Sequence, residues 1–335
     1  MSQTKPAILE GTKLPDIQCL SPRVAVALGQ NPSLFTGPGT NTYLVGTGPK
    51  RLLLDTASGH DAYMPVLEEA MAQIGCKEIE GIVLTHAHPD HIGGVQQVRK
   101  HFGSMPVYKL PWPTPDPDAK SGDEEPPDSR RHPDSLAEGS LEVLEEGDLV
   151  ETEGARLRAI FTPGHAPDHL CFMLEEEGNL FSGDNVLGIG TTVIPAESGN
   201  LGDYMDSLER ILREKPKAIY PAHGPRIESG VRKIEEYLSH RRKREEQVLE
   251  AVAAGDRDAM TMVKRIYVGY PETLYPAAAQ SVTSHLKKLE RDGRVRSHEQ
   301  QTLWSLAESN SPSRWSAESL LPRSDRGLRE RPKAS

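Results

Sequence analysis

The segment Thr85–Gly94, which reads THAHPDHIGG, constrains this chain more than any other part of the sequence. The segment begins where the apolar run Ile79–Thr85 ends, and this apolar run predicts a buried strand. Side chains two residues apart in a strand point to the same side, and the proline then turns the chain back toward that space. Imidazole and carboxylate groups together suit zinc or a similar divalent ion. The four ligand-type residues of the segment are His86, His88, Asp90 and His91.

Three further segments each place one ligand-type residue just after a predicted strand. The motif TPGH ends at His165, SGD ends at Asp184, and YPAHG contains His223. Taken singly, each residue is also compatible with an ordinary turn. Because functional residues concentrate on loops at one edge of a rigid sheet, their shared position predicts that they join the histidines of Thr85–Gly94 in one site.

The rest of the hydrophobic pattern predicts strands and helices in mixed order. Prolines interrupt about the first 30 residues, so we expect this N-terminal segment to be irregular, with one short strand over Val24–Leu28. Thr42–Val45 and Arg51–Asp55 predict a hairpin. Helical spacing and antiparallel-strand patterns follow further along the chain. The predicted helices are Tyr63–Ile74, Tyr204–Glu214 and Val231–Ala254, and the predicted strands are Leu157–Phe161, Leu170–Leu174 and Asn179–Phe181.

Composition divides the chain into a catalytic domain over residues 1–254 and a smaller module over residues 255–308. Within the first, residues from about 112 to 140 combine prolines with acidic side chains and predict a disordered insert. Within the second, helices are expected over 261–267 and 276–291, followed by two short extended runs, which is the order of elements in a winged-helix module. Residues 309–335 are rich in serine and arginine and predict a disordered tail.

Composition and charge exclude several classes of protein. No run reaches the ~18 consecutive apolar residues that a spanning helix needs, so we expect no membrane partner. Three cysteines without paired spacing exclude a disulfide scaffold and indicate a reducing compartment. A net charge of −10 argues against binding nucleic acid through the whole surface. Because the N-terminus lacks a secretory or presequence pattern, we expect a cytoplasmic location.

The HxHxDH run, followed by TPGH, SGD and YPAHG, resembles the metallo-β-lactamase superfamily over residues 31–240. The stretches GTNTYLVGTG, DYMDSLERIL and HLKKLERDGRV are further similar to the lactamase-β-like protein 2 group. That group includes an animal mitochondrial endoribonuclease, and related fungal enzymes are acyl-carrier-protein thioesterases. The resemblance implies an α+β fold, the αββα sandwich, with a winged-helix-like module at the C-terminus. For a eukaryotic source it implies the mitochondrial matrix.

The resemblance also implies two Zn²⁺ ions per chain, with Mn²⁺ or Fe²⁺ as alternatives. Two such ions lower the pKa of a shared water, so that a metal-bridged hydroxide attacks the substrate near neutral pH. Asp90 is then a candidate catalytic proton acceptor as well as a ligand. Ala87 stands where relatives often carry a bulky aromatic residue, which bears on substrate contacts rather than on metal binding. The implied ligands are His86, His88 and His165 for one ion, and Asp90, His91 and His223 for the other, with Asp184 bridging both.

Three features leave alternative interpretations open. His169 either contacts the substrate or supports the ligands, or it makes a structural hydrogen bond within its turn. The run RRKR at 241–244 predicts a salt-bridged helix face rather than a targeting signal. Basic residues of the C-terminal module face RNA phosphates or form mixed charge pairs, and the second interpretation is favoured because the module's charges nearly cancel. These residues are Lys287, Lys288, Arg291, Arg294 and Arg296.

We therefore expect an enzyme, a dinuclear zinc-dependent hydrolase that acts on single-stranded RNA as an endoribonuclease or on a small molecule. A thioesterase and a lactonase or β-lactam hydrolase of the same fold are the alternatives. A nucleic-acid-binding regulator with a vestigial hydrolase site belongs to another class, and it is disfavoured because every ligand position holds a competent ligand. A homodimer is an open alternative to a monomer.

Overall fold

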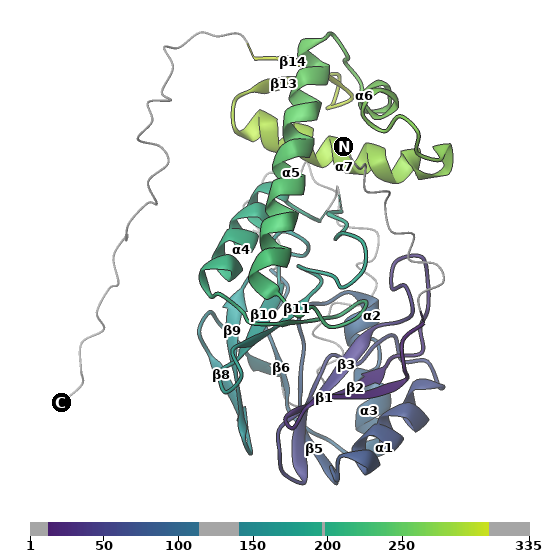
Figure 1. Ribbon diagram of the computed structural model, residues 1–335, viewed down its shortest axis with the longest axis vertical. Coiled ribbons are helices and arrows are strands. Elements are labelled where there is room, and N and C mark those ends of the chain that lie inside the picture. The colour runs from purple at the N-terminus through teal and green to yellow at the C-terminus, as the bar shows by residue number, and fades with distance from the viewer. Residues whose placement is uncertain (1–12, 114–140, 196–197, 308–335) are drawn as a thin grey trace, which may run out of the picture.

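The computed structural model describes residues 13–113, 141–195 and 198–307. Two β-sheets lie face to face with helices on their outer sides, and a small, mainly helical module covers one end (Figure 1). This arrangement confirms the expected αββα sandwich of the α+β class with a C-terminal winged-helix-like module. The insert expected at about 112–140 lies outside the described residues from 114 onward, and so does the tail expected at 309–335.

The first sheet corrects one prediction about the N-terminal segment. The segment that we expected to be irregular contains an additional strand, β1, which pairs antiparallel with β2. Pro15 and Pro22 flank β1 rather than interrupt it, so its amide groups remain free to pair. The antiparallel pairing of β3 and β4 confirms the expected hairpin. In spatial order the strands are β1 (Ile17–Ser21), β2 (Val24–Leu28), β3 (Asn41–Val45), β4 (Lys50–Leu54), β5 (Glu78–Val83), β6 (Val107–Lys109) and β7 (Leu141–Val143).

The second sheet contains the three expected antiparallel strands at its centre. Strand β10 pairs antiparallel with both β9 and β11, whereas β12 pairs parallel with β11. The parallel pair brings the carboxyl ends of β11 and β12 to the same edge. In spatial order the strands are β12 (Ile219–Pro221), β11 (Asn179–Gly183), β10 (Leu170–Leu174), β9 (Ala155–Phe161) and β8 (Leu149–Thr152).

Three apolar layers hold the sandwich together. One lies between the first sheet and its helices, one between the two sheets, and one between the second sheet and its helices. Leu53 belongs to the first layer and its neighbours Leu52 and Leu54 to the second, so β4 is buried on both faces and its sequence is a continuous apolar run. The helices are α1 (Tyr63–Gln73), α2 (Pro89–Ile92), α3 (Val95–Phe102), α4 (Leu201–Arg213) and α5 (Gly230–Ala253).

The C-terminal module has its own apolar core, which α5 helps to form. Helix α5 runs along the molecule from the second sheet to the module (Figure 1). Its residues Ile234 and Leu238 pack in the third layer, whereas Val248 and Val252 pack with α7 in the module. The expected order of two helices and a hairpin is confirmed. The elements are α6 (Ala259–Ile266), the 3-10 turn η2 (Glu272–Leu274), α7 (Tyr275–Arg291), β13 (Val295–His298) and β14 (Leu303–Leu306).

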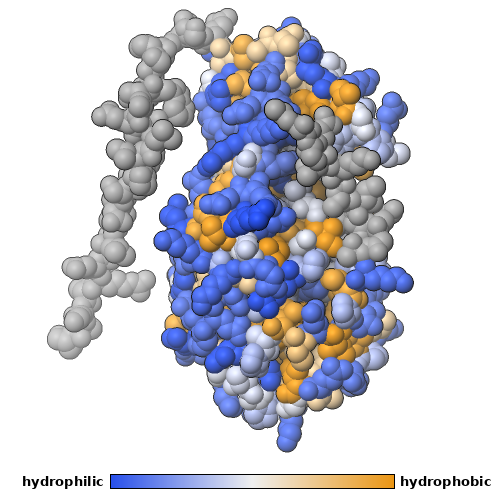
Figure 2. Space-filling model, in the orientation of Figure 1, coloured by the Kyte–Doolittle hydropathy of each residue, from blue (hydrophilic) through white to orange (hydrophobic). Residues whose placement is uncertain are grey.

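The surface carries charged and polar side chains with apolar residues between them. On the face shown in Figure 2, hydrophilic residues predominate and apolar residues gather in several separate patches. Within the described part of the chain, no helix combines the length and the apolar character that crossing a membrane requires.

Candidate metal centre

All the segments with ligand-type residues converge where the two sheets meet at one edge. The N–H of Leu170, at the start of β10, donates to the carbonyl of Thr85 just beyond β5 (2.8 Å), so the sheets are joined at this point. Each ligand-type residue follows a strand end or lies on the short helix α2. The sequence-predicted residues brought together here are His86, His88, Asp90, His91, His165, Asp184 and His223.

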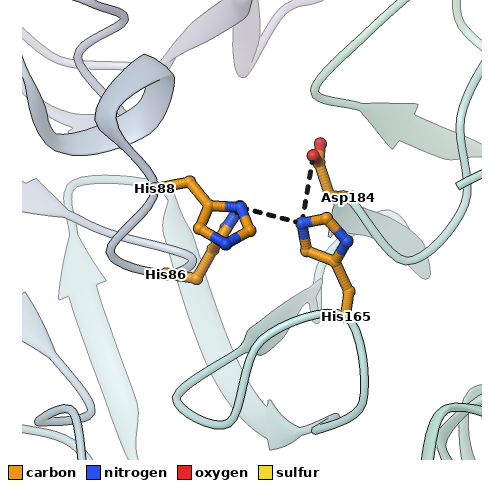
Figure 3. A group of neighbouring side chains, drawn as sticks. All are labelled: His86, His88, His165 and Asp184. Atoms are coloured by element: carbon orange, nitrogen blue, oxygen red, sulfur yellow. Dashed lines mark hydrogen bonds and ion pairs between the residues drawn. The ribbon is translucent and has the colours of Figure 1, made fainter. Parts of the chain in front are cut away.

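The first group of side chains surrounds His88. The Nδ1 atom of His88 lies 3.0 Å from Nε2 of His86 and 3.0 Å from Nε2 of His165. Asp184 completes the group, with its Oδ2 atom 3.4 Å from Nε2 of His165. In Figure 3 the two histidines after β5 face His165 and Asp184 from the opposite side of the site. The group thus offers three nitrogens and one oxygen to a common point.

The second group lies directly beside the first. Nε2 of His223 is 3.2 Å from Oδ2 of Asp90, and Nε2 of His91 is 3.4 Å from the same oxygen. The other oxygen of Asp184, Oδ1, is 3.2 Å from Nε2 of His223 and 3.5 Å from Nε2 of His91. The two carboxylate oxygens of Asp184 therefore face different groups, which is the arrangement expected of a bridging ligand.

The spacing of these atoms fits a divalent metal ion. Donors about 2.0–2.1 Å from zinc at tetrahedral angles lie about 3.3 Å apart, close to the separations given above. Two buried atoms, Nε2 of His91 and Oδ1 of Asp184, have no hydrogen-bond partner among the described residues. A buried polar atom without a partner is costly, and a cation at the centre of each group would satisfy both atoms. The donor set therefore fits two divalent ions.

Burial prepares three of the histidines to act as ligands. Burial, with the neighbouring His165 as the next cause, lowers the pKa of His88 to about 3. Burial likewise lowers the pKa of His86 and of His165. These imidazoles are therefore neutral at pH 7, and a neutral nitrogen is the form that binds a metal.

The histidines of the second group behave differently because carboxylates face them. Burial opposes a charge on His223, but Asp184 and then Asp90 outweigh it and raise the pKa of His223 to about 9. Burial is likewise outweighed at His91, where Asp90 and Asp184 raise the pKa well above its usual value. Metal uptake by this group must therefore displace protons.

Asp55 contacts a ligand-type residue, and our sequence analysis missed it. It follows β4 directly, and its Oδ2 atom lies 2.8 Å from Nδ1 of His91. The backbone N–H of Thr85 donates to the same carboxylate at 2.9 Å, and the Thr85 hydroxyl also donates to it. Asp55 therefore orients His91 so that Nε2 faces the site. The signal in the sequence was an acidic residue at the end of the apolar run RLLLD.

His169 supports Asp184 rather than facing an open space. It is completely buried, and its Nε2 atom accepts the backbone N–H of Asp184 at 3.1 Å. Its Nδ1 atom therefore carries the proton and donates to the hydroxyl of Thr162 at 2.8 Å. Burial lowers the pKa of His169 well below its usual value, so it stays neutral. With both nitrogens occupied, His169 has the geometry of a residue that holds the loop of Asp184.

Asn41 holds the loop that carries His223. Its side-chain amide donates to the carbonyl oxygens of Pro221 (2.9 Å) and Gly224 (2.8 Å), on either side of the histidine. Its backbone N–H donates to the carbonyl of Ala222 at 2.7 Å. The first residue of β3 therefore fixes the position of the loop that carries a ligand-type residue.

Two groups of histidines and aspartates at the edge of an αββα sandwich define a class of protein, the metal-dependent hydrolases of this fold. The model of the metallo-beta-lactamase superfamily matches residues 35–223, and the model of the beta-lactamase associated winged helix domain matches residues 259–304. The chain belongs to the metallo-beta-lactamase superfamily and is a hydrolase of that superfamily.

Individual relatives are similar over most of the chain. The beta-lactamase-like protein 2 homolog of Drosophila melanogaster is 40% identical over 290 residues, covering 84% of this chain and 93% of that protein. The atrochrysone carboxyl ACP thioesterase AgnL7 of Paecilomyces divaricatus is 40% identical over 240 residues, covering 71% and 67%. The crystal structure of a metallo-beta-lactamase family protein from Thermus thermophilus is similar with a TM-score of 0.68 and 25% identity, covering 86% and 100%.

Proposed function

We propose that the chain is a dinuclear zinc hydrolase. The observation that carries this proposal is the position of Asp184, whose two oxygens face two separate groups of ligand-type residues. When bound there, two zinc ions would supply Lewis acidity and activate water for attack near neutral pH. The nitrogen-rich donor set favours zinc over Mn²⁺, which prefers oxygen ligands. One ion is assigned to His86, His88 and His165 and the other to Asp90, His91 and His223.

Asp90 is the carboxylate that we propose as the proton acceptor. Its side chain is 25% exposed, whereas that of Asp184 is 12% exposed, so Asp90 is the better placed of the two to exchange a proton with solvent. Asp184 has its two oxygens directed at the two groups and is assigned the bridging role. These are complementary tasks for two carboxylates in one site.

We propose an acyl thioester as the substrate, because apolar side chains flank the centre. Leu34 and Phe35 are 61% and 70% exposed on the loop that leads to Gly39, whose carbonyl lies 3.5 Å from Nδ1 of His223. On the other side Val193 is 48% exposed, and its carbonyl contacts His165. Exposed apolar groups of this kind favour a substrate with an apolar chain. The fungal relatives named as thioesterases support the same choice.

Charge pairing in the C-terminal module disfavours RNA as the substrate. Lys288 pairs with Glu245 and with Asp292, and Arg291 pairs with Asp203. Binding of a nucleic-acid backbone needs an excess of clustered positive charge, which paired residues do not supply. Cleavage of single-stranded RNA is therefore the second candidate function, and RNA is included as a separate substrate in the experiment below.

The test combines metal analysis with a substrate panel. Protein purified without chelators is loaded with zinc, Mn²⁺ or Fe²⁺ and incubated with short-chain and long-chain acyl thioesters, single-stranded RNA and nitrocefin. We expect about two zinc ions per chain and faster turnover of the long-chain thioester. Asp184→Asn should lose this activity, and Phe35→Ser should lose the preference for the long chain. Protein that retains and regains no transition metal would contradict the proposal, and preferential cleavage of RNA would replace the thioester with the second candidate.

A further inference from the structure

The basic run at 241–244 does not form the uniform salt-bridged face that its sequence predicts. Arg242 pairs with Glu209 at 2.8 Å, and Arg244 lies over the ring of Tyr267. Arg241, in contrast, is only 6% exposed, and no carboxylate in the described ranges forms an ion pair with it. A guanidinium that is buried without a carboxylate is costly to keep, so its contacts indicate what it does.

The contacts of Arg241 lie on the loop between β11 and α4 and on α4 itself. Its Nη2 atom donates to the carbonyl of Thr192, and its guanidinium lies 5.3 Å from the ring centre of Tyr204. One helical turn earlier on α5, the hydroxyl of Tyr237 donates to the carbonyl of Gly190 at 3.0 Å. Residues 187–195 of this loop form no helix or strand. Side chains of α5 therefore hold a segment that has no hydrogen bonds of a helix or a β-sheet to keep it in place.

The same loop contacts the metal centre at two points. The hydroxyl of Thr192 donates to the backbone carbonyl of Asp184 at 2.6 Å. The carbonyl of Val193 lies 2.8 Å from Nδ1 of His165 and accepts its proton. A proton fixed on Nδ1 leaves the Nε2 lone pair of His165 directed at the other ligands. The loop thus sets the tautomer of one ligand-type residue and the backbone of another.

We propose that Arg241 is a positioning residue for the metal centre, and that it acts by anchoring the Thr192 carbonyl so that Val193 and Thr192 stay in place against His165 and Asp184. The inference rests on the proposed function, because it takes these two residues to be metal ligands.

The test measures zinc affinity in the full chain, without reference to activity. Arg241→Met removes the anchor, Arg241→Lys keeps the charge and one donor, and Thr192→Val removes the hydroxyl. Arg242→Met is the matched control, because it removes the same charge from the next position of the same helix. Zinc binding is measured by competition with a chromophoric chelator. The variant His165→Ala identifies which binding step belongs to the first group.

We expect Arg241→Met to weaken the step that depends on His165 by about ten-fold or more, the range found when groups that orient metal ligands are lost. Arg241→Lys should recover part of the affinity, Thr192→Val should weaken binding, and Arg242→Met should bind as the wild type does. In proton NMR spectra of the zinc-loaded protein, the downfield N–H resonance of His165 should shift or broaden in Arg241→Met. The same resonance should stay unchanged in Arg242→Met.

Two results separate failure of this inference from failure of the proposed function. If wild-type protein binds two zinc ions and both Arg241 variants match it within two-fold in each binding step, the positioning role is wrong and the hydrolase proposal stands. If wild-type protein binds no zinc, the proposed function fails first. Should Arg241→Met not fold, Arg241→Lys and Thr192→Val decide by the same measurement.

Discussion

Asp55 contacts His91 on the side of the ring that faces away from the other ligand-type residues. Its carboxylate accepts hydrogen bonds from Thr85 and fixes the orientation of the imidazole. Its backbone has a φ of 58°, in the left-handed region that aspartate and asparagine tolerate better than most residues. An asparagine at this position should therefore keep the backbone while losing the negative charge.

We predict that Asp55→Asn lowers zinc affinity by about 10–100-fold, because ligands lose basicity and orientation when such a partner is weakened. The folded structure should be retained, as judged by circular dichroism. Asp61→Asn, a change at an exposed carboxylate, is the control and should bind zinc normally. Wild-type affinity in Asp55→Asn would show that His91 is oriented by the backbone alone.

His169 gives a second prediction, which separates support of Asp184 from direct contact with the substrate. His169→Ala leaves the N–H of Asp184 without its partner, at a cost of about 1–3 kcal/mol for a buried group. We expect weaker zinc binding and a lower melting temperature. A raised KM with unchanged zinc content and unchanged stability would instead support direct contact with the substrate. The matched change is His101→Ala, at a half-exposed histidine far along α3 from the site.

The ligand-type residues could be predicted from the sequence because each follows a strand within a few residues, so local pattern places it at the sheet edge. The contacts of Asp55 and Arg241 could not be predicted, and the sequence left the role of His169 open. Their partners are separated from them by many positions, for example 36 between Asp55 and His91 and 49 between Arg241 and Thr192. Contacts of that kind depend on how whole elements pack, which a local pattern does not contain.

Among the elements, α5 connects the sandwich to the C-terminal module. Its Glu245 lies 2.9 Å from Nζ of Lys288 on α7 and 3.9 Å from Nδ1 of His285 on the same helix. Burial alone would raise the pKa of Glu245, but the nearby His285 ring and the hydrogen bond that Lys288 donates outweigh it, and the pKa is lowered. The ionised carboxylate therefore stabilises the contact between α5 and α7.

The direction of this pKa shift determines how the stabilisation by Glu245 depends on pH. A carboxyl group with a lowered pKa in the folded chain contributes stability above its unfolded-state pKa, and that contribution is lost as the pH falls through the folded-state value. We predict that Glu245→Gln lowers the melting temperature at pH 7 by about 2 °C. The difference from wild type should shrink as the solution is acidified. Glu246→Gln, at the exposed neighbour, should show neither effect, and a difference that grows on acidification would contradict the assignment.

Element prediction succeeded where apolar periodicity was strong and failed at the N-terminal edge. Helix α4 was expected at Tyr204–Glu214 and spans Leu201–Arg213, because its apolar stripe packs directly on the second sheet. Strand β1 was missed because its residues are only partly buried and it forms the sheet edge, so its sequence carries little alternation. Its existence depends on pairing with β2, which is a tertiary property.

At the scale of the whole molecule, the two apolar cores share one helix. The sandwich uses Ile234 and Leu238 of α5, and the C-terminal module uses Val248 and Val252. The boundary that we propose at residue 254 falls just after α5. Part of the module's apolar core therefore consists of α5 side chains from the preceding domain. A helix that is continuous through both cores can transmit loss of packing in the module to the loop held by Tyr237 and Arg241.

We predict that Leu286→Ala, a change deep in the module's core, destabilises the chain by about 2–5 kcal/mol through cavity formation. Because α5 is shared, thermal unfolding should remain a single transition, and zinc should be released at a lower temperature than from the wild type. Calorimetry with a zinc-sensitive dye checks both. Lys287→Ala, at the exposed position next to it, is the control. Two separate transitions, with zinc release unchanged, would show instead that the module unfolds independently and that α5 does not couple it to the metal centre.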